Sequence, residues 1–261
     1  MHSKTYALLF LDLVGSTAFI ERVGSTAAAK KFFGHDKLTR TLIYRYEGVE
    51  IDKTDGFMII FDRCICAVNF ALAYHRTIPK RTGLKARIGI HWGEVIMKEN
   101  QRVHVERGAK RIEIEGLAKP IGARIMSLAQ GGQTLMSDAA RKASEHRKNA
   151  YTHKKARFMS LGNYKLKGVK SVMLIHAVGI DGDDFRLPRE NAKVKRISPP
   201  SNPRQDWTLR EYLLFSAKAV ARLLFVYGLF QIGYISWEMR WLFDRYVDPD
   251  SVVRLLLGHE W

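Results

Sequence analysis

Two acidic residues at the ends of strand-like apolar runs are the residues best suited to chemistry. Asp12 follows the apolar residues 7–11, and Asp55 lies in a turn ahead of the apolar residues 57–61. A carboxylate at the edge of a buried strand is costly unless it is hydrogen-bonded, paired with a cation or bound to a metal. The pair predicts a Mg²⁺ or Mn²⁺ site. The alternative is that one acid caps a helix and the other forms a hairpin turn.

The segment directly after Asp12 adds a second signal. It consists of Leu13, Val14, Gly15, Ser16 and Thr17 and leads into a helix-like stretch. A strand that enters a Gly-Ser-Thr turn directs backbone N–H groups and a helix N-terminus toward the end of the strand, and this suits phosphate. We therefore expect the metal and a phosphate-bearing ligand at the same corner of the fold.

Four segments in order along residues 5–178 form a larger pattern. They are residues 10–17, the hairpin Asp55-Gly56-Phe57, the strand-like residues 87–93, and the helix-like residues 123–129 followed by residues 131–137. In these segments the chain resembles the class III nucleotidyl cyclases, the family of adenylate and guanylate cyclase catalytic domains. The resemblance implies an α+β fold with a ferredoxin-like core, in which helices pack on a mainly antiparallel sheet.

The resemblance also implies a reaction. A nucleoside triphosphate would be converted to a 3′,5′-cyclic nucleotide and pyrophosphate, with two Mg²⁺ or Mn²⁺ ions per site held by Asp12 and Asp55. Two metal ions can lower the pKa of the ribose hydroxyl and stabilise the phosphate charge. We expect ATP as the substrate. GTP and a pyrimidine nucleotide remain open alternatives.

Arg124 borders the apolar stripe of its predicted helix, because it lies three residues after Ile121 and four before Leu128. The resemblance implies that it reaches across a homodimer interface to the phosphates. The alternative is an arginine that extends over core side chains to water. Lys167 lies near a phosphate-binding lysine of the family, although a solvated lysine at a strand end fits equally well. Lys53 resembles a family lysine on which selection of the nucleotide base depends.

Three departures from the family pattern bear on the function. Pro120 stands where the family has an asparagine that orients the ribose, and this departure favours a second hypothesis. The hairpin containing Lys53 is shorter by a residue or differently aligned, which leaves the base open. Glu113 and Glu115 occupy the region of base selection without a clear match. The second hypothesis is a catalytically silent cyclase-like module that binds nucleotide or only dimerises.

The composition constrains the partners. The chain has 261 residues and a formal net charge of +17, so it needs anionic partners or counter-ions. The basic residues lack an aromatic stacking pattern, and we do not expect nucleic-acid binding. Cys64 and Cys66, the two cysteines, are too close for an unstrained disulfide and are expected to be structural. No signal sequence is visible at the N-terminus, and a cytoplasmic location is expected.

The pattern of the chain predicts three regions. Residues 1–179 alternate strand-like and helix-like segments, with a hairpin at residues 49–61 and a helix or a pair of helices at residues 26–46. Residues 180–206 are a basic, Pro-containing linker. Residues 207–261 are apolar and aromatic and are expected to be helical. They would contact a membrane or a partner protein, or mediate dimerisation; the length of the uncharged run does not decide between these. His91 is expected to be structural.

Overall fold

The computed structural model describes residues 2–54, 56–145, 156–180, 182–188 and 190–197. The helices are α1 (Ser16–Val23), α2 (Ser25–Arg45), α3 (Cys64–Thr82), α4 (Arg102–Val105), α5 (Ala118–Leu128) and α6 (Asp138–Glu145), with a short 3-10 helix, η2 (Gly182–Phe185). The strands are β1 (His2–Leu13), β2 (Gly48–Lys53), β3 (Gly56–Phe61), β4 (Ala86–Glu99), β5 (Ile112–Glu115), β6 (Thr134–Ser137), β7 (Arg157–Leu166), β8 (Val172–Gly179) and β9 (Val194–Arg196).

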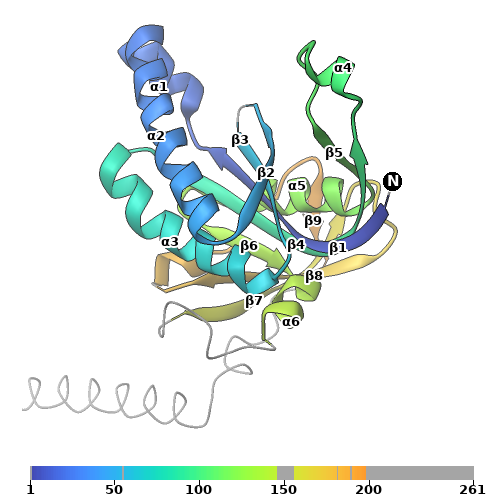
Figure 1. Ribbon diagram of the computed structural model, residues 1–261. Coiled ribbons are helices and arrows are strands. Elements are labelled where there is room, and N and C mark those ends of the chain that lie inside the picture. The colour runs from blue at the N-terminus through green and yellow to red at the C-terminus, as the bar shows by residue number, and fades with distance from the viewer. Residues whose placement is uncertain (1, 55, 146–155, 181, 189, 198–261) are drawn as a thin grey trace, which may run out of the picture. The chain divides into compact units, whose positions relative to one another are not determined.

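The strands form one mixed sheet in the order β2-β3-β1-β4-β6-β8-β7-β9, with β5 paired to the outer part of β4 (Figure 1). The pairs are antiparallel except for β4 and β6, which run parallel. The long strands β1 and β4 pair along their whole length, from His2 opposite Met97 to Leu13 opposite Ala86. The expected α+β fold with a mainly antiparallel sheet is confirmed.

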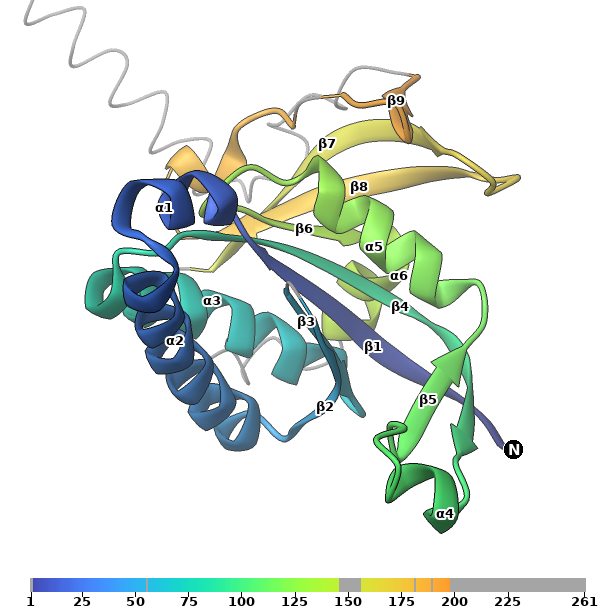
Figure 2. The same ribbon diagram turned by 90° about the horizontal axis from the view of Figure 1, so that it is seen from above.

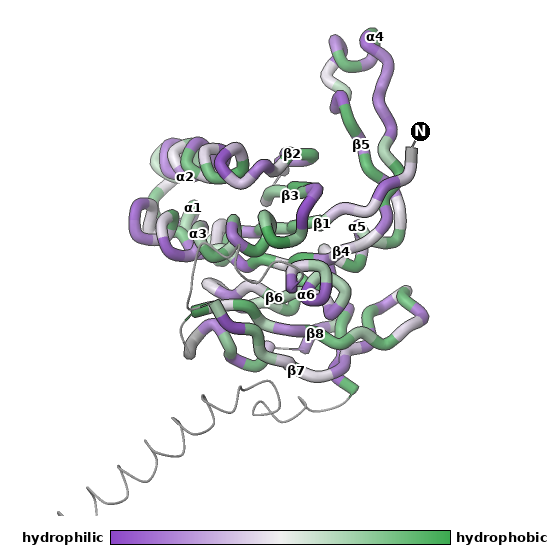
Figure 3. Tube along the Cα trace, turned by 60° about the horizontal axis from the view of Figure 1, so that its bottom comes forward, coloured by the Kyte–Doolittle hydropathy of each residue, from purple (hydrophilic) through white to green (hydrophobic). Residues whose placement is uncertain are grey.

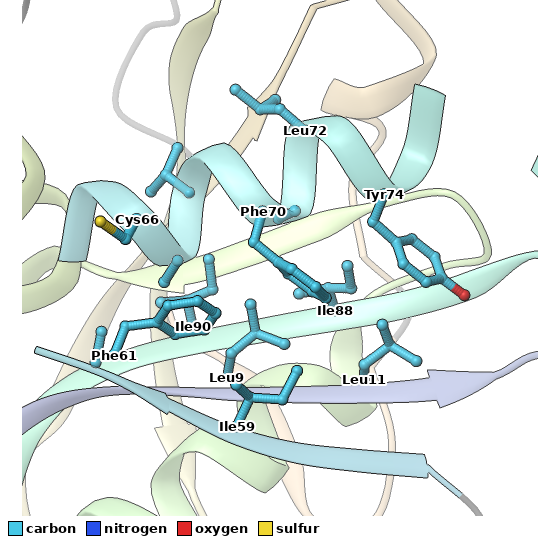
Figure 4. Packing of buried hydrophobic residues seen from close by; sticks show 14 of the residues in the cluster. Leu9, Leu11, Ile59, Phe61, Cys66, Phe70, Leu72, Tyr74, Ile88 and Ile90 are labelled. Atoms are coloured by element: carbon cyan, nitrogen blue, oxygen red, sulfur yellow. The ribbon is translucent and has the colours of Figure 1, made fainter. Parts of the chain in front are cut away.

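The largest core cluster lies between the sheet and helix α3. Alternate residues of β1, such as Leu9 and Leu11, point to this face, because side chains of a strand alternate between its two sides. Phe61, Phe70 and Tyr74 pack with them, as Figure 4 shows. Helix α2 packs beside α3 and also contacts β2, with hydrophilic and hydrophobic residues alternating along it (Figure 3). This packing fixes α2 and α3 relative to the end of β1.

Helix α5 covers the opposite face of the sheet (Figure 2). It approaches the strands closely because two glycines leave room for it. A Cβ atom at Gly89 would lie 2.3 Å from the backbone nitrogen of Met126, and one at Gly122 would lie 2.7 Å from the ring of Phe10. Any larger side chain at these positions would force the helix away. The backbones of β4 and α5 are therefore in direct contact.

The segment after residue 179 is partly folded onto the domain. Val194–Arg196, within the predicted linker, forms β9 and pairs with β7, and the side-chain amide of Gln133 donates to the carbonyl oxygens of Asp184 and Arg186. Within the described ranges, no helix is both long and apolar enough to cross a membrane. The predicted contact segment, residues 207–261, lies outside the described residues.

Candidate functional site

Asp12 lies near the C-terminal end of β1, and its side chain is 22% exposed. Arg87, directly opposite on β4, donates to it from Nε at 2.9 Å and from Nη2 at 2.6 Å, both to Oδ2. The guanidinium therefore balances the carboxylate charge where the strand leaves the core. Asp12 does not cap helix α1, because the residue at the N-cap is Gly15 and no side chain caps this helix.

The hairpin between β2 and β3 presses against the same end of β1. Gly56 pairs with Asp12, and a Cβ atom at Gly56 would lie 2.0 Å from the carbonyl oxygen of Leu11. Only glycine allows so close an approach. Thr54 and Gly56 line the cavity that contains Asp12. Asp55, the second predicted metal ligand, lies outside the described residues.

The turn after β1 contributes the next wall of the cavity. Gly15 has φ 72°, a left-handed conformation that suits glycine, and it reverses the chain into α1. Of the five residues predicted to bind phosphate here, four line the cavity: Leu13, Gly15, Ser16 and Thr17. Val14 points elsewhere and is half exposed beside Gly131. The free N–H groups at the start of α1 therefore lie at the cavity, next to Asp12.

Helix α2 supplies the opposite wall through His35 and Asp36, which sequence reasoning did not identify. His35 is 1% exposed; its Nδ1 lies 3.0 Å from Oδ1 of Asp36, and its Nε2 lies 2.6 Å from the hydroxyl of Tyr74. Oδ2 of Asp36 lies 3.4 Å from Nζ of Lys53. Burial lowers the pKa of His35, and the adjacent Asp36 carboxylate opposes this effect only in part. A hydrogen-bonded network thus reaches the cavity from the core.

The cavity has a volume of about 720 Å³. Its lining includes two carboxylates, three hydroxyl groups, an ammonium group, a guanidinium group and a helix N-terminus. They belong to Asp12 and Asp36, to Ser16, Thr17 and Thr54, to Lys53, to Arg87 and to the start of α1. Oxygen ligands of this kind suit Mg²⁺, and the N–H groups with the ammonium suit phosphate. Among the described residues, which omit Asp55, no three His, Cys, Asp or Glu side chains converge as a metal site.

Arg124 and Lys167 do not line this cavity. Arg124 lies beside Gly168, the residue after Lys167, since its Nη2 would be 3.7 Å from a Cβ atom at Gly168. The Nε of Arg124 is buried and has no hydrogen-bond acceptor among the described residues. A buried guanidinium nitrogen without an acceptor is costly. The Nε–H group of Arg124 is thus a buried donor whose acceptor does not belong to the described residues.

His91, Glu113, Glu115 and Cys64 do not line the cavity that contains Asp12. His91 is buried on the face of α5, and its Nδ1 lies 2.9 Å from the hydroxyl of Ser137, in agreement with a structural role. Glu113 and Glu115 lie on β5 and line a second cavity of about 390 Å³, in which Lys110 pairs with Asp52. Burial raises the pKa of the Cys64 thiol to about 12, so this thiol stays protonated.

Comparisons with known proteins agree with this geometry. No family model and no curated protein matches the chain. An adenylate cyclase from Trypanosoma brucei, solved in its monomeric state, is 21% identical with a TM-score of 0.58 and covers 71% of this chain and 92% of its own. The adenylyl cyclase CyaB from P. aeruginosa is 16% identical, with a TM-score of 0.58 and coverage of 71% and 100%.

A third solved structure is a guanylate cyclase domain from Catenaria anguillulae in complex with GTP. It is 18% identical, with a TM-score of 0.56, and covers 68% of this chain and 98% of its own. At these identities the likeness establishes the fold. The described part of the chain therefore has the fold of adenylate and guanylate cyclase catalytic domains, as the resemblance of the four sequence segments implies.

Proposed function

We propose that this chain is a nucleotidyl cyclase that converts a nucleoside triphosphate, with ATP as the expected substrate, to a 3′,5′-cyclic nucleotide and pyrophosphate. One observation carries the proposal: a single cavity is shared by Asp12, the start of α1 and the residues on both sides of Asp55. Ligands for a divalent cation and donors for a triphosphate thus lie at one corner of a cyclase fold. GTP and a pyrimidine nucleotide remain alternative substrates.

The residues around Asp12 fit Mg²⁺ or Mn²⁺, because its carboxylate is partly exposed and hydroxyl oxygens line the same cavity. We propose that Asp12 and Asp55 hold two such ions. When bound, the ions lower the pKa of the ribose 3′-hydroxyl and stabilise charge on the phosphates. The N–H groups of α1 and the ammonium of Lys53 would orient the triphosphate for in-line attack on its α-phosphorus.

A homodimer would complete the site. Arg124 has a buried Nε without an acceptor among the described residues, and it lies beside Gly168 and outside the cavity of its own chain. We propose that Arg124, together with Lys167, contacts the triphosphate bound at Asp12 of a second copy. A two-fold dimer would then contain two equivalent sites, and a single chain would be inactive.

Pro120 favours a second candidate, a silent cyclase-like module that binds nucleotide or only dimerises. It lies in the first turn of α5, where proline is tolerated but supplies no side-chain donor or acceptor. The position resembles that of a ribose-orienting asparagine in the family. Loss of such a contact would weaken orientation of the ribose, and in the extreme case would abolish cyclisation.

The decisive experiment incubates the purified full chain with each of the four ribonucleoside triphosphates in Mg²⁺ or Mn²⁺. Mass spectrometry then detects cyclic nucleotide. Formation of a 3′,5′-cyclic product that disappears in Asp12→Ala supports the cyclase and identifies its base. No product with any of the four, from a verified dimer that still binds nucleotide, supports the silent module.

We also propose that the catalytic part lies in the cytoplasm and that residues 207–261 contact a membrane or a partner, or help to hold two copies together. Support comes from the apolar and aromatic composition of this segment and the basic residues before it. Sedimentation of the full chain with and without anionic vesicles separates membrane contact from dimerisation in solution.

A further inference from the structure

A directed chain of polar contacts runs from the core to the hairpin that carries Asp55. Tyr74, on α3, reaches down beside Leu11 (Figure 4) and meets His35 on α2. His35 meets Asp36, Asp36 pairs with Lys53 on β2, and Nζ of Lys53 donates to the carbonyl oxygen of Thr54 at 2.9 Å. Nζ also lies 5.3 Å from the ring centroid of Phe57.

We propose that Asp36 is a positioning residue of the site: through Lys53 it holds the turn of the β2–β3 hairpin, at Thr54, against the cavity that contains Asp12, and so supports metal binding there. The proposal rests on the cyclase function proposed above, since it assigns Asp36 and Lys53 to the support of that site. Asp36 acts through Lys53 and Thr54 and does not itself touch the substrate. In this role Lys53 acts mainly through its contact with Thr54. Its contact with the triphosphate is secondary.

The donors and acceptors along the chain are consistent with one another. Burial keeps His35 neutral, so it has one N–H and one acceptor nitrogen. The carboxylate of Asp36 can only accept, and His35 therefore donates from Nδ1. Its Nε2 then accepts from the hydroxyl of Tyr74, whose proton burial also retains. Each contact thus fixes the direction of the next, and the ammonium of Lys53 is the end that faces the cavity.

Burial falls along the same path. His35 is 1% exposed, Asp36 is 18% exposed and Lys53 is 25% exposed. The buried end cannot move without disturbing the core, whereas the other end contacts the turn of the hairpin. A loop held only by its own backbone would be mobile at this place. The network therefore supports the hairpin at Thr54 from the core, in addition to the contact of Gly56 with β1.

A second ion pair between α2 and β2 serves as a matched control. It tests whether any ion pair that joins these two elements has the same effect. Arg40, on the same helix, donates to Glu50 on the same strand from Nε and Nη2, each at 2.8 Å. Neither residue lines the cavity. If α2 and β2 only needed to be joined, then Arg40→Gln would have the same effect as Asp36→Asn. If the hairpin needs positioning, only the Asp36 variant affects the site.

The test compares Asp36→Asn, Lys53→Met and Lys53→Arg with Arg40→Gln and the unaltered full chain. Mn²⁺ binding is measured by titration with electron paramagnetic resonance, and cyclase kcat and KM are measured at varied Mn²⁺. We expect Asp36→Asn and Lys53→Met to weaken Mn²⁺ binding by roughly tenfold, as does loss of residues that support metal ligands. Lys53→Arg, which keeps the charge, should restore most of the affinity, and Arg40→Gln should leave it unchanged.

Two outcomes would overturn the inference. One is that Asp36→Asn and the unaltered chain bind Mn²⁺ with equal affinity and need the same Mn²⁺ concentration for half-maximal cyclase activity. The other is equal losses in Asp36→Asn and Arg40→Gln, because these would show a general tether. If the unaltered chain binds Mn²⁺ but forms no cyclic product, the cyclase proposal fails while the binding comparison still decides the role of Asp36. Far-ultraviolet circular dichroism and thermal melting confirm that each variant is folded.

Discussion

Arg87 donates two hydrogen bonds to a single oxygen of Asp12, from Nε at 2.9 Å and from Nη2 at 2.6 Å. The two residues face each other across strands β4 and β1, 75 positions apart in the chain. The carboxylate that would bind a cation is thus already paired with one. Binding of Mg²⁺ at Asp12 is therefore expected to act against the attraction of Arg87 for the same oxygen.

The first prediction concerns this competition. Arg87→Met keeps the aliphatic stem but removes the charge. We expect the free energy of unfolding in EDTA to fall by about 1 to 3 kcal/mol, because a half-buried carboxylate loses charged donors. We expect Mg²⁺ to stabilise the variant more than the unaltered chain. Urea unfolding with EDTA or Mg²⁺ measures both effects.

Arg102→Met is the control for Arg87→Met. Arg102 pairs with Glu106 on α4, and its side chain is 92% exposed, so its loss should change stability by less than about 0.5 kcal/mol. Equal stabilisation by Mg²⁺ in the unaltered chain and in Arg87→Met would show that Arg87 does not compete with the metal.

The second prediction concerns the contact between the hairpin and β1. Gly56→Ala places a methyl group 2.0 Å from the carbonyl oxygen of Leu11, so the hairpin must shift away from Asp12. A shift of about 1 Å should lower kcat by roughly 100-fold, and overpacking should cost about 1 to 3 kcal/mol of stability. Steady-state kinetics and urea unfolding test these values.

Gly34→Ala is the matched glycine control. A Cβ atom at Gly34 has nothing within 4 Å, and the residue lies within helix α2. Alanine is the better helix former, so stability should rise by about 0.5 to 1 kcal/mol with no change in activity. Normal activity and stability in Gly56→Ala would refute the role given to this close contact.

The third prediction concerns the dimer. Asp12→Ala and Arg124→Ala should each be inactive, because each removes one part of both sites. When the two variants are mixed and exchange subunits, random pairing should restore about a quarter of the original activity, since half of the dimers contain one intact site. Product is measured after mixing, and mixed dimers are verified by differently tagged chains. Mixed dimers without activity would rule out the shared site.

The fourth prediction concerns pH. Burial lowers the pKa of His91 from its ordinary value of 6.5 to about 4. Between these two pH values the unfolded chain binds more protons than the folded chain, so stability falls as pH falls. The stability advantage of the unaltered chain over His91→Gln should therefore shrink by about 2 kcal/mol from pH 7 to pH 5. Urea unfolding at both pH values measures this change.

His75 and His35 also have lowered pKa values through burial, and they remain in the His91→Gln variant. Both chains should therefore lose stability in acid, and only the difference between them reports His91. A difference that stays constant from pH 7 to pH 5 would mean that His91 has the same pKa in the folded and unfolded chains, as expected of a histidine accessible to water.

The sequence predicts helices and strands well where the periodicity of apolar residues is clear. The expected helical region at residues 26–46 is a single helix, α2. Ile88 and Ile90 of β4 lie in the core and Trp92 packs against it, as the two-residue period of a strand requires. Helix α3 continues to Thr82. Pro79 lies within its last turns, and Gly83 closes it with an N–H donated to the Pro79 carbonyl. Proline near a helix end is a weaker stop than the pattern suggests.

The site is predictable only in its local parts. Asp12, Gly15 and Ser16 form one continuous segment, and spacing alone indicates their proximity. Arg87 and Asp36 belong to the same cavity but come from distant segments. Their place depends on strand register and helix packing, which no local period specifies. The position of Arg87 opposite Asp12 follows only from the pairing of β1 with β4.

The glycines under α5 have a consequence for how this site can change. The backbone of Gly89 contacts the backbone of Met126 directly. The distance of Arg124, on the same helix, from the strands therefore does not depend on the size of a side chain between them. Exchange of one apolar residue for another therefore cannot gradually change the distance between α5 and the strands at this position. New substrate preferences would have to arise in the surrounding loops, while the contact between β4 and the helix that carries Arg124 stays constant.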